Sequence, residues 1–232
     1  MIKSSKMRLG KIWHSFHLYT CMVSSIRSLI LVNIPKGSGM TIYYHPYIKT
    51  NNMNTNRLSP TIEAALNAQM TKEAHAAQIY LSLGAWADSQ AFGGVANFLF
   101  RHAQEERNHM MKILEYILKR GGKVKITAIP DPIPDPKNLQ TCFEDVFKQE
   151  VDNTASIYKV VKLSLTEEDW ATWNFMQWFV KEQTEEETLA IELLDKIKVA
   201  GNEHSALYSF DRDLISTPDD AKLAQDVTAD NP

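Results

Sequence analysis

The chain has 232 residues, 44% of them hydrophobic and 23% charged, which is enough for one domain of ordinary size to bury a full core. Residues 1–62 hold eight Lys and Arg and no Asp or Glu, so the remainder carries 17 basic against 28 acidic residues. This acidic body argues against a nucleic-acid partner and favours attraction of cations. The longest apolar run, residues 28–32, is far shorter than a membrane span, and we expect no membrane partner.

The cysteine content indicates the redox environment. Cys21 and Cys142 are the two cysteines of the sequence, and one pair cannot form the disulfide framework typical of small secreted domains. A reducing, intracellular compartment is the simpler interpretation. We therefore expect a cytoplasmic protein.

Residues 1–58 form a basic, acid-free N-terminal extension without helical or alternating periodicity. Three interpretations compete. Its composition is typical of an organelle transit segment; a secretory signal fits less well, because the apolar stretch begins late and lacks a clear cleavage site. The interpretation that we favour is a translation start near Met53, which makes the upstream residues an artefact or a dispensable, disordered tail.

A first long helix is predicted over residues 59–89. Ser59 suits the N-cap position and Pro60 the first helical position, and apolar or small residues then recur at helical spacing. A second helix follows a break near Gly93–Gly94 and runs to about residue 120, where Gly121–Gly122 provide a C-cap.

The next segment, Lys123–Lys137, is predicted to be an extended spacer, because proline occupies every second position from Pro130 to Pro136. A helix of about 25 residues is about 38 Å long, and some fifteen extended residues reach about 45 Å. The spacer can therefore run the whole length of a bundle and let the third helix lie parallel to the second. One long crossover is the connection found in ferritin-like bundles.

Two further long helices and a short one complete the predicted fold. The third helix spans about Leu139–Leu165, the fourth begins at Thr166–Asp169 and is closed by Gly201, and a short amphipathic fifth helix covers about Glu203–Leu214. The tail, residues 216–232, is predicted to be disordered. The fold class is all-α: a four-helix bundle with one long crossover and a short C-terminal fifth helix, over residues 59–215.

Each of the four long helices places an acidic residue on its apolar stripe. Leaving even one carboxylate unpaired in an apolar bundle costs several kcal/mol, and no Lys or Arg shares these stripes. Protonation or bound cations must neutralise them, and oxygen-rich ligation with one imidazole suits iron or manganese better than a closed zinc site. The arrangement matches that of di-iron carboxylate bundles. The residues are Glu73 on the first helix, Glu106 and His109 on the second, Glu150 on the third, and Gln183 and Glu186 on the fourth.

Three segments carry a resemblance to bacterial non-haem ferritins, members of the ferritin-like di-iron family: Asn67–Met70, Arg101–His109 and Gln177–Glu187. The resemblance implies a dinuclear iron centre. Glu73, Glu106 and His109 would hold the first iron, with Glu106 bridging. Glu150 and Glu186 would hold the second, with Gln183 close by.

The motif on the fourth helix separates this chain from relatives of that family. Bacterioferritins and rubrerythrins have a second Glu-x-x-His there, whereas this chain has Gln183-x-x-Glu186. The centre is therefore expected to be asymmetric. Arg107 stands where bacterioferritins carry their haem-binding Met, so we expect no haem.

The resemblance also implies accessory residues. Glu105, Glu182 and Glu185 resemble a third iron site of bacterial ferritins, with Glu186 shared. Tyr80 lies two turns after Glu73 on the same face and matches a tyrosine beside the dinuclear centre, with a hydrogen-bonding or one-electron donor role. His102 is expected to line the core without binding metal.

The resemblance implies an iron-storage ferroxidase. It would oxidise iron(II) to iron(III) with dioxygen or peroxide and store the product as a ferric oxyhydroxide mineral inside a shell of identical subunits, 24 in the family. One alternative is a non-catalytic shell subunit, against which the complete ligand set argues. The other is a rubrerythrin-like peroxidase, which should carry a Cys-x-x-Cys pair that this sequence lacks.

Overall fold

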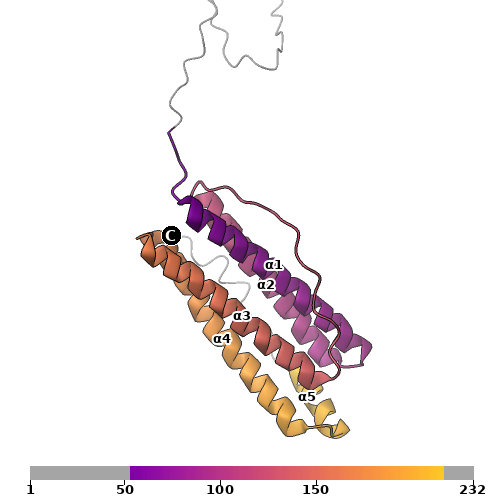
Figure 1. Cartoon of the computed structure of the whole chain (residues 1–232). Helices are drawn as coiled ribbons and strands as arrows, with labels where there is room; N and C mark the ends of the chain where they lie inside the picture. Colours follow the sequence, from indigo (N-terminus) through magenta and orange to yellow (C-terminus); the bar gives the residue numbers. More distant parts are fainter. Residues whose placement is uncertain (1–52, 217–232) are drawn as a thin grey trace, which may run out of the picture. The chain divides into compact units, whose positions relative to one another are not determined.

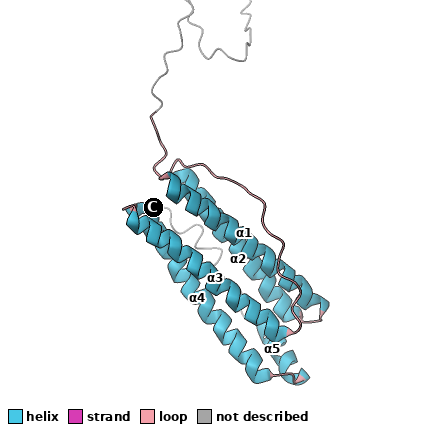
Figure 2. Ribbon diagram, in the orientation of Figure 1, coloured by secondary structure: helices cyan, strands magenta, loops and turns pink. Residues whose placement is uncertain are grey.

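The computed structural model describes residues 53–216, and predictions made for residues 1–52 and 217–232 fall outside the described part. The described part is all-α, as predicted, and Figure 2 shows helices joined by loops without a strand. Its five helices are α1 (Pro60–Ser89), α2 (Gly93–Lys119), α3 (Leu139–Thr166), α4 (Trp170–Ala200) and α5 (His204–Ser216).

Helices α1 and α2 form an antiparallel hairpin (Figure 1). The predicted cap of α1 is present: the Ser59 hydroxyl accepts a hydrogen bond from the Ile62 amide at 3.1 Å. The break predicted near Gly93–Gly94 lies directly before these glycines, which are helical residues of α2. The chain reverses earlier, at Ala91, which adopts a φ of 64°.

The crossover between α2 and α3 runs along α1, as Figure 1 shows. The Asn67 side chain donates to the Lys123 carbonyl at 3.0 Å and accepts from the Lys125 amide at 2.6 Å. Further along α1, the hydroxyl groups of Thr71 and Thr127 lie 3.1 Å apart. This polar edge of α1 guides the proline-rich segment and lets α3 start at the opposite end of the bundle from the end of α2.

The junction of α3 and α4 lies later than the sequence predicts. Thr166 ends α3 rather than beginning α4, and Glu168 turns the chain with a φ of 55°. Asp169 is the N-cap of α4, because its carboxylate accepts from the Thr172 amide at 3.0 Å and from the Thr172 hydroxyl at 2.7 Å. Glu167 and Glu168, which were predicted to begin α4, belong to the turn before it. Of the acidic run, only Asp169 caps the helix.

Helix α5 closes one end of the bundle by capping α2. The Phe92 N-cap position of α2 has no side-chain hydrogen bond, and the buried Asp211 carboxylate of α5 accepts from the Val95 amide at 2.9 Å instead. Gly94 makes this approach possible, since a Cβ there would lie 1.8 Å from the Asp211 carbonyl oxygen.

The apolar core is divided into two clusters along the bundle. The buried residues of one cluster include Leu83, Leu99 and Phe143. Those of the other include Leu66, Ile113 and Phe179. The predicted polar residues of the stripes occur in sequence between these clusters on each long helix. Within residues 53–216, no helix combines the length and hydropathy that a membrane-spanning helix requires.

Candidate metal centre

The structure buries the acidic residues that periodicity places on the apolar stripes. The relative exposure of Glu73 and Glu150 is 0%, and that of Glu106 is 2%. His109, Gln183 and Glu186 are also buried. Four helices thus direct titratable or amide groups into one polar layer between two apolar clusters.

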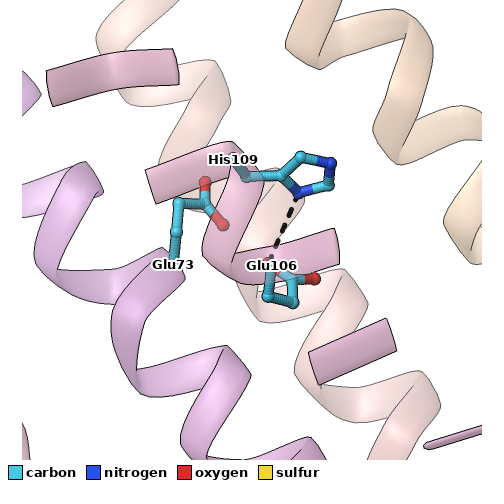
Figure 3. A group of neighbouring side chains, drawn as sticks. All are labelled: Glu73, Glu106 and His109. Atoms are coloured by element: carbon cyan, nitrogen blue, oxygen red, sulfur yellow. Dashed lines mark ion pairs between the residues drawn. The ribbon is translucent and has the colours of Figure 1, made fainter. Parts of the chain in front are cut away.

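Glu73 from α1 and the pair Glu106 and His109 from α2 form the first candidate ligand group (Figure 3). One ligand atom from each lies within 4.8 Å of the others, a spacing that a single metal ion can bridge. His109 Nδ1 is 3.5 Å from Glu106 Oε2. Figure 3 shows the other ring nitrogen directed away from both carboxylates. The ring is held edge-on by Trp178 and Phe179, whose centroids are 5.4 Å and 6.0 Å away.

The electrostatics of this group disfavour a full set of charged carboxylates in the metal-free protein. Burial raises the pKa of Glu106 well above its usual range, and the charges of Glu150 and Glu73 raise it further. Burial also lowers the pKa of His109 to about 3, so its ring is neutral and forms no ion pair with Glu106. Glu106 Oε2 is buried and has no hydrogen-bond partner. A cation beside this oxygen would supply the missing partner. The unpartnered oxygen therefore fits the role of a metal ligand.

Two amide side chains that sequence reasoning did not assign to the site hold Glu73. Gln69 donates to Glu73 Oε1 at 2.7 Å, and Asn153 of α3 donates to Glu73 Oε2 at 2.9 Å. Gln69 also donates to Asn153 Oδ1 at 2.7 Å, so the three side chains form one buried network. Burial raises the pKa of Glu73, and these hydrogen bonds oppose the rise. Their positions in the sequence could have indicated this role, because Gln69 lies one turn before Glu73 and Asn153 lies three residues after Glu150.

Glu150 is held on the opposite side of the layer. The Tyr80 hydroxyl donates to Glu150 Oε1 at 2.5 Å, and the Gln183 amide donates to Glu150 Oε2 at 3.0 Å. Burial raises the pKa of Glu150, and these two hydrogen bonds oppose the rise. Gln183 also lies 3.2 Å from the Thr154 hydroxyl, so its amide nitrogen faces α3. Glu150 belongs to none of the groups of candidate metal ligands found among the described residues.

Two further ligand groups adjoin the first. His102, Glu105 and Glu186 form one, and Glu105, His109 and Glu182 form the other. Burial raises the pKa of Glu186 well above its usual range, with added repulsion from Glu105 and Glu150. Glu185, predicted to belong to a third iron site, is exposed and lies 3.4 Å from the Lys181 ammonium.

Comparisons with known proteins identify the family of this chain. Residues 63–200 match the model of the ferritin family, described as a ferritin-like domain. The chain belongs to the ferritin family. A bacterial non-heme ferritin of Escherichia coli is 35% identical over 157 residues, which are 68% of this chain and 95% of that protein. One from Campylobacter jejuni is 37% identical over 155 residues, covering 67% and 93%.

The solved structures show the same relationship. A novel open pore ferritin from the hyperthermophilic archaeon Archaeoglobus fulgidus superposes with a TM-score of 0.68 at 35% identity, covering 69% of this chain and 99% of that one. The ferritin-like fold and membership of the family predicted from sequence are therefore confirmed. The matched residues 63–200 include every candidate ligand from Glu73 to Glu186.

Proposed function

We propose that this chain is a subunit of an iron-storage ferritin whose polar layer is a ferroxidase centre. The observation that carries the proposal is the buried, unpartnered Glu106 Oε2 between Glu73 and a neutral His109. Carboxylates in an apolar bundle persist in their charged form when cations compensate them. Relatives described as bacterial non-heme ferritins support iron as that cation.

The residues divide into ligands and groups that orient them. Glu73, Glu106 and His109 would hold one iron(II). Glu150 and Glu186 would hold the second iron. Gln69 and Asn153 orient Glu73, while Tyr80 and Gln183 orient Glu150. Such partners of metal ligands set the direction and basicity of the ligand atoms.

The chemistry is a two-electron transfer to the oxidant. Each of two iron(II) ions gives up one electron, and dioxygen takes both with two protons to become hydrogen peroxide. Hydrogen peroxide as oxidant takes the same two electrons with two protons and becomes two water molecules. Carboxylates favour iron(III), the harder ion, so the ligand set assists the oxidation.

Storage requires many copies of the subunit, since one bundle cannot enclose a mineral. A closed symmetric shell supplies the space. Resemblance to ferritins predicts 24 subunits, and iron(III) would move from the centre to a ferric oxyhydroxide mineral inside. Under this proposal the protein acts in the cytoplasm, and its partners are copies of itself and the mineral. The ferritin-like domain is residues 59–215.

The test is an aerobic addition of iron(II) to the full chain while the ferric absorbance is followed. Glu106→Gln and His109→Ala should slow the initial rate by at least about tenfold, since loss of even a partner of a metal ligand costs 10–100-fold. Glu115→Gln is the matched control, because Glu115 is an exposed glutamate on the same helix. Equal rates in all four proteins would remove the ferroxidase assignment.

Particle size tests storage separately. Light scattering or analytical ultracentrifugation of the full chain should show a large closed assembly. A particle of one or two subunits would contradict storage even if oxidation were observed.

A further inference from the structure

A row of packed aromatic rings connects the proposed iron centre with one end of the bundle. His109, a proposed iron ligand, packs edge-on against Phe179, with the ring centroids 6.0 Å apart. The centroids of Phe179 and Phe175 are 5.6 Å apart. Phe175 lies flat on Tyr116 near the end of α2, with centroids 3.8 Å apart and 6° between the ring planes. The row therefore begins at a proposed ligand and ends at a phenol, a group that can be oxidised by one electron.

The Tyr116 hydroxyl has a defined proton acceptor. Its oxygen lies 3.0 Å from the hydroxyl oxygen of the buried Thr172. Thr172 donates its single hydroxyl hydrogen to Asp169 Oδ2 at 2.7 Å, so Tyr116 must be the donor to Thr172. Burial raises the pKa of Tyr116, which keeps the phenol protonated at neutral pH. Loss of an electron from this phenol can therefore be coupled to movement of its proton toward Asp169.

Asp169 can take up this proton without loss of a metal ligand. It belongs to none of the candidate ligand groups found among the described residues. Its side chain is 13% exposed, so water can take the proton onward. The hydroxyl of Tyr80 instead donates to Glu150, a proposed ligand of the second iron. A proton released from Tyr80 would neutralise that ligand, whereas one released from Tyr116 leaves the ligand set intact.

The indole of Trp178 is a less favourable place for the oxidation to remain. Its ring centroid is 5.4 Å from that of His109 and 4.9 Å from that of Phe179. The Lys112 ammonium lies 4.0 Å from the same indole centroid. An indole that has lost an electron carries a positive charge, and an ammonium at this distance repels that charge. The lysine therefore favours oxidation of Tyr116 over oxidation of Trp178.

We propose that Tyr116 donates an electron to the iron centre through the rings of Phe175 and Phe179, and that Thr172 passes its proton to Asp169. The proposal rests on the proposed function, because the iron centre and its peroxide oxidant receive the electron. It adds a donor at the end of the bundle to Tyr80, the tyrosine expected from sequence to lie beside the centre.

The electron is needed when the centre holds a single iron(II). Hydrogen peroxide takes two electrons and two protons to become two water molecules, but one iron(II) supplies only one electron. That single electron would split peroxide into hydroxide and a hydroxyl radical. Tyr116 supplies the second electron and becomes a neutral phenoxyl radical, while its proton moves through Thr172 to Asp169. Two protons from solvent complete the two water molecules, and the iron leaves as iron(III).

The experiment is freeze-quench electron paramagnetic resonance on the full-length assembly. One iron(II) per subunit is added without oxygen and then mixed with one equivalent of hydrogen peroxide. The wild type should show a radical signal that narrows when the protein contains ring-deuterated tyrosine. Tyr116→Phe, which keeps the stack on Phe175, should form iron(III) but lose this signal. Tyr158→Phe, on an exposed tyrosine of α3, is the control and should keep it.

Variants of Thr172 test the proton path, because they leave the phenol in place. Thr172→Val keeps the size of the side chain but removes the hydroxyl, and it should lose the tyrosyl signal. Thr172→Ser keeps the hydroxyl and should retain the signal. Both variants keep the backbone amide that donates to Asp169 at the start of α4, so the helix cap is preserved. Equal signals in the valine and serine variants would overturn the assigned proton path.

The remaining outcomes separate this route from the proposed function. A signal that persists in Tyr116→Phe, or that narrows with ring-deuterated tryptophan instead of tyrosine, overturns the route. Iron(III) formed in the wild type without a tyrosyl signal also overturns it, while the ferroxidase proposal stands. A wild type that forms no iron(III) with peroxide or with dioxygen would overturn the proposed function, and this route with it.

Discussion

Asn153 on α3 donates its side-chain amide to Glu73 Oε2 on α1 across 2.9 Å, in a position where both residues are almost completely buried. Gln69 occupies the other oxygen of the same carboxylate. Both Glu73 oxygens are therefore engaged before any metal arrives, and the carboxylate is aimed toward Glu106 and His109 by groups from two helices. This connection makes the first ligand group depend on the packing of α1 against α3.

Replacement of Asn153 tests this dependence. Asn153→Leu removes the donor to Glu73 Oε2 and should weaken zinc(II) binding at the first position about tenfold or more, as for other partners of metal ligands. Competition with a chromophoric chelator measures the affinity. Asn174→Leu, which changes an exposed asparagine on α4, is the control. Unchanged zinc affinity in Asn153→Leu would show that Glu73 needs no help from α3.

Tyr80 provides a second test, on the other side of the polar layer. Tyr80→Phe leaves the packing but removes the 2.5 Å hydrogen bond to Glu150. We expect a loss of about 1–3 kcal/mol, the usual cost of a missing partner for a buried polar group, measured as a lower thermal midpoint of the metal-free protein. Tyr158→Phe, on an exposed tyrosine of α3, is the control. If both variants melt like the wild type, Tyr80 does not hold Glu150.

The buried carboxyl groups predict an unusual pH dependence of the metal-free protein. Burial raises the pKa of Glu106 and of Glu186 well above the 4.5 of an unperturbed glutamate. Between the unfolded and folded pKa values, the folded state binds more protons than the unfolded chain. The stability that these groups contribute is thus fully present below about pH 4.5 and lost as pH rises through their folded pKa values.

The histidines act in the opposite direction at lower pH. Burial lowers the pKa of His102 to about 4 and that of His109 to about 3, from 6.5. The stability that the two neutral histidines contribute is lost as pH falls below 6.5. Above pH 6.5 this contribution stays constant, so it does not mask the effect of the two carboxyl groups. At pH values above 6.5 and below the raised folded pKa values of the carboxyl groups, the thermal midpoint of the metal-free protein should fall as pH rises. Glu106→Gln should reduce the slope, and a wild-type midpoint that rises over this interval would contradict the assignment of raised pKa values.

Adjacent glycines at the start of α2 give a matched pair of stability variants. Gly94→Ala would place a Cβ 1.8 Å from the Asp211 carbonyl oxygen and push α5 from the helix that it caps. Overpacking of this kind costs about 1–3 kcal/mol, seen as a lower thermal midpoint. Gly93→Ala meets no atom within 4 Å and should stabilise α2 by about 0.5–1 kcal/mol. Equal midpoints for the two variants would show that α5 is not held at this point.

Much of the fold could be predicted because its signals are local. Periodic apolar residues defined the long helices, Ser59 and Pro60 marked the start of α1, and alternate prolines indicated the crossover. The start of α4 was misplaced because Thr166 begins a sequence that resembles a helix N-terminus. Which residue of that run acts as N-cap depends on the turn at Glu168, and local composition does not show it.

Sequence alone determined which side chains point inward, because the helical repeat places residues at three- and four-residue spacing on one face whatever lies opposite. It thereby determined the buried positions of Glu73, Glu106 and Glu150. Only the tertiary structure decided the partners, since the relative register of two helices arises from packing across the bundle. That register brings Asn153 to Glu73 and His102 to Glu186, contacts that join residues 80 and 84 positions apart in the chain.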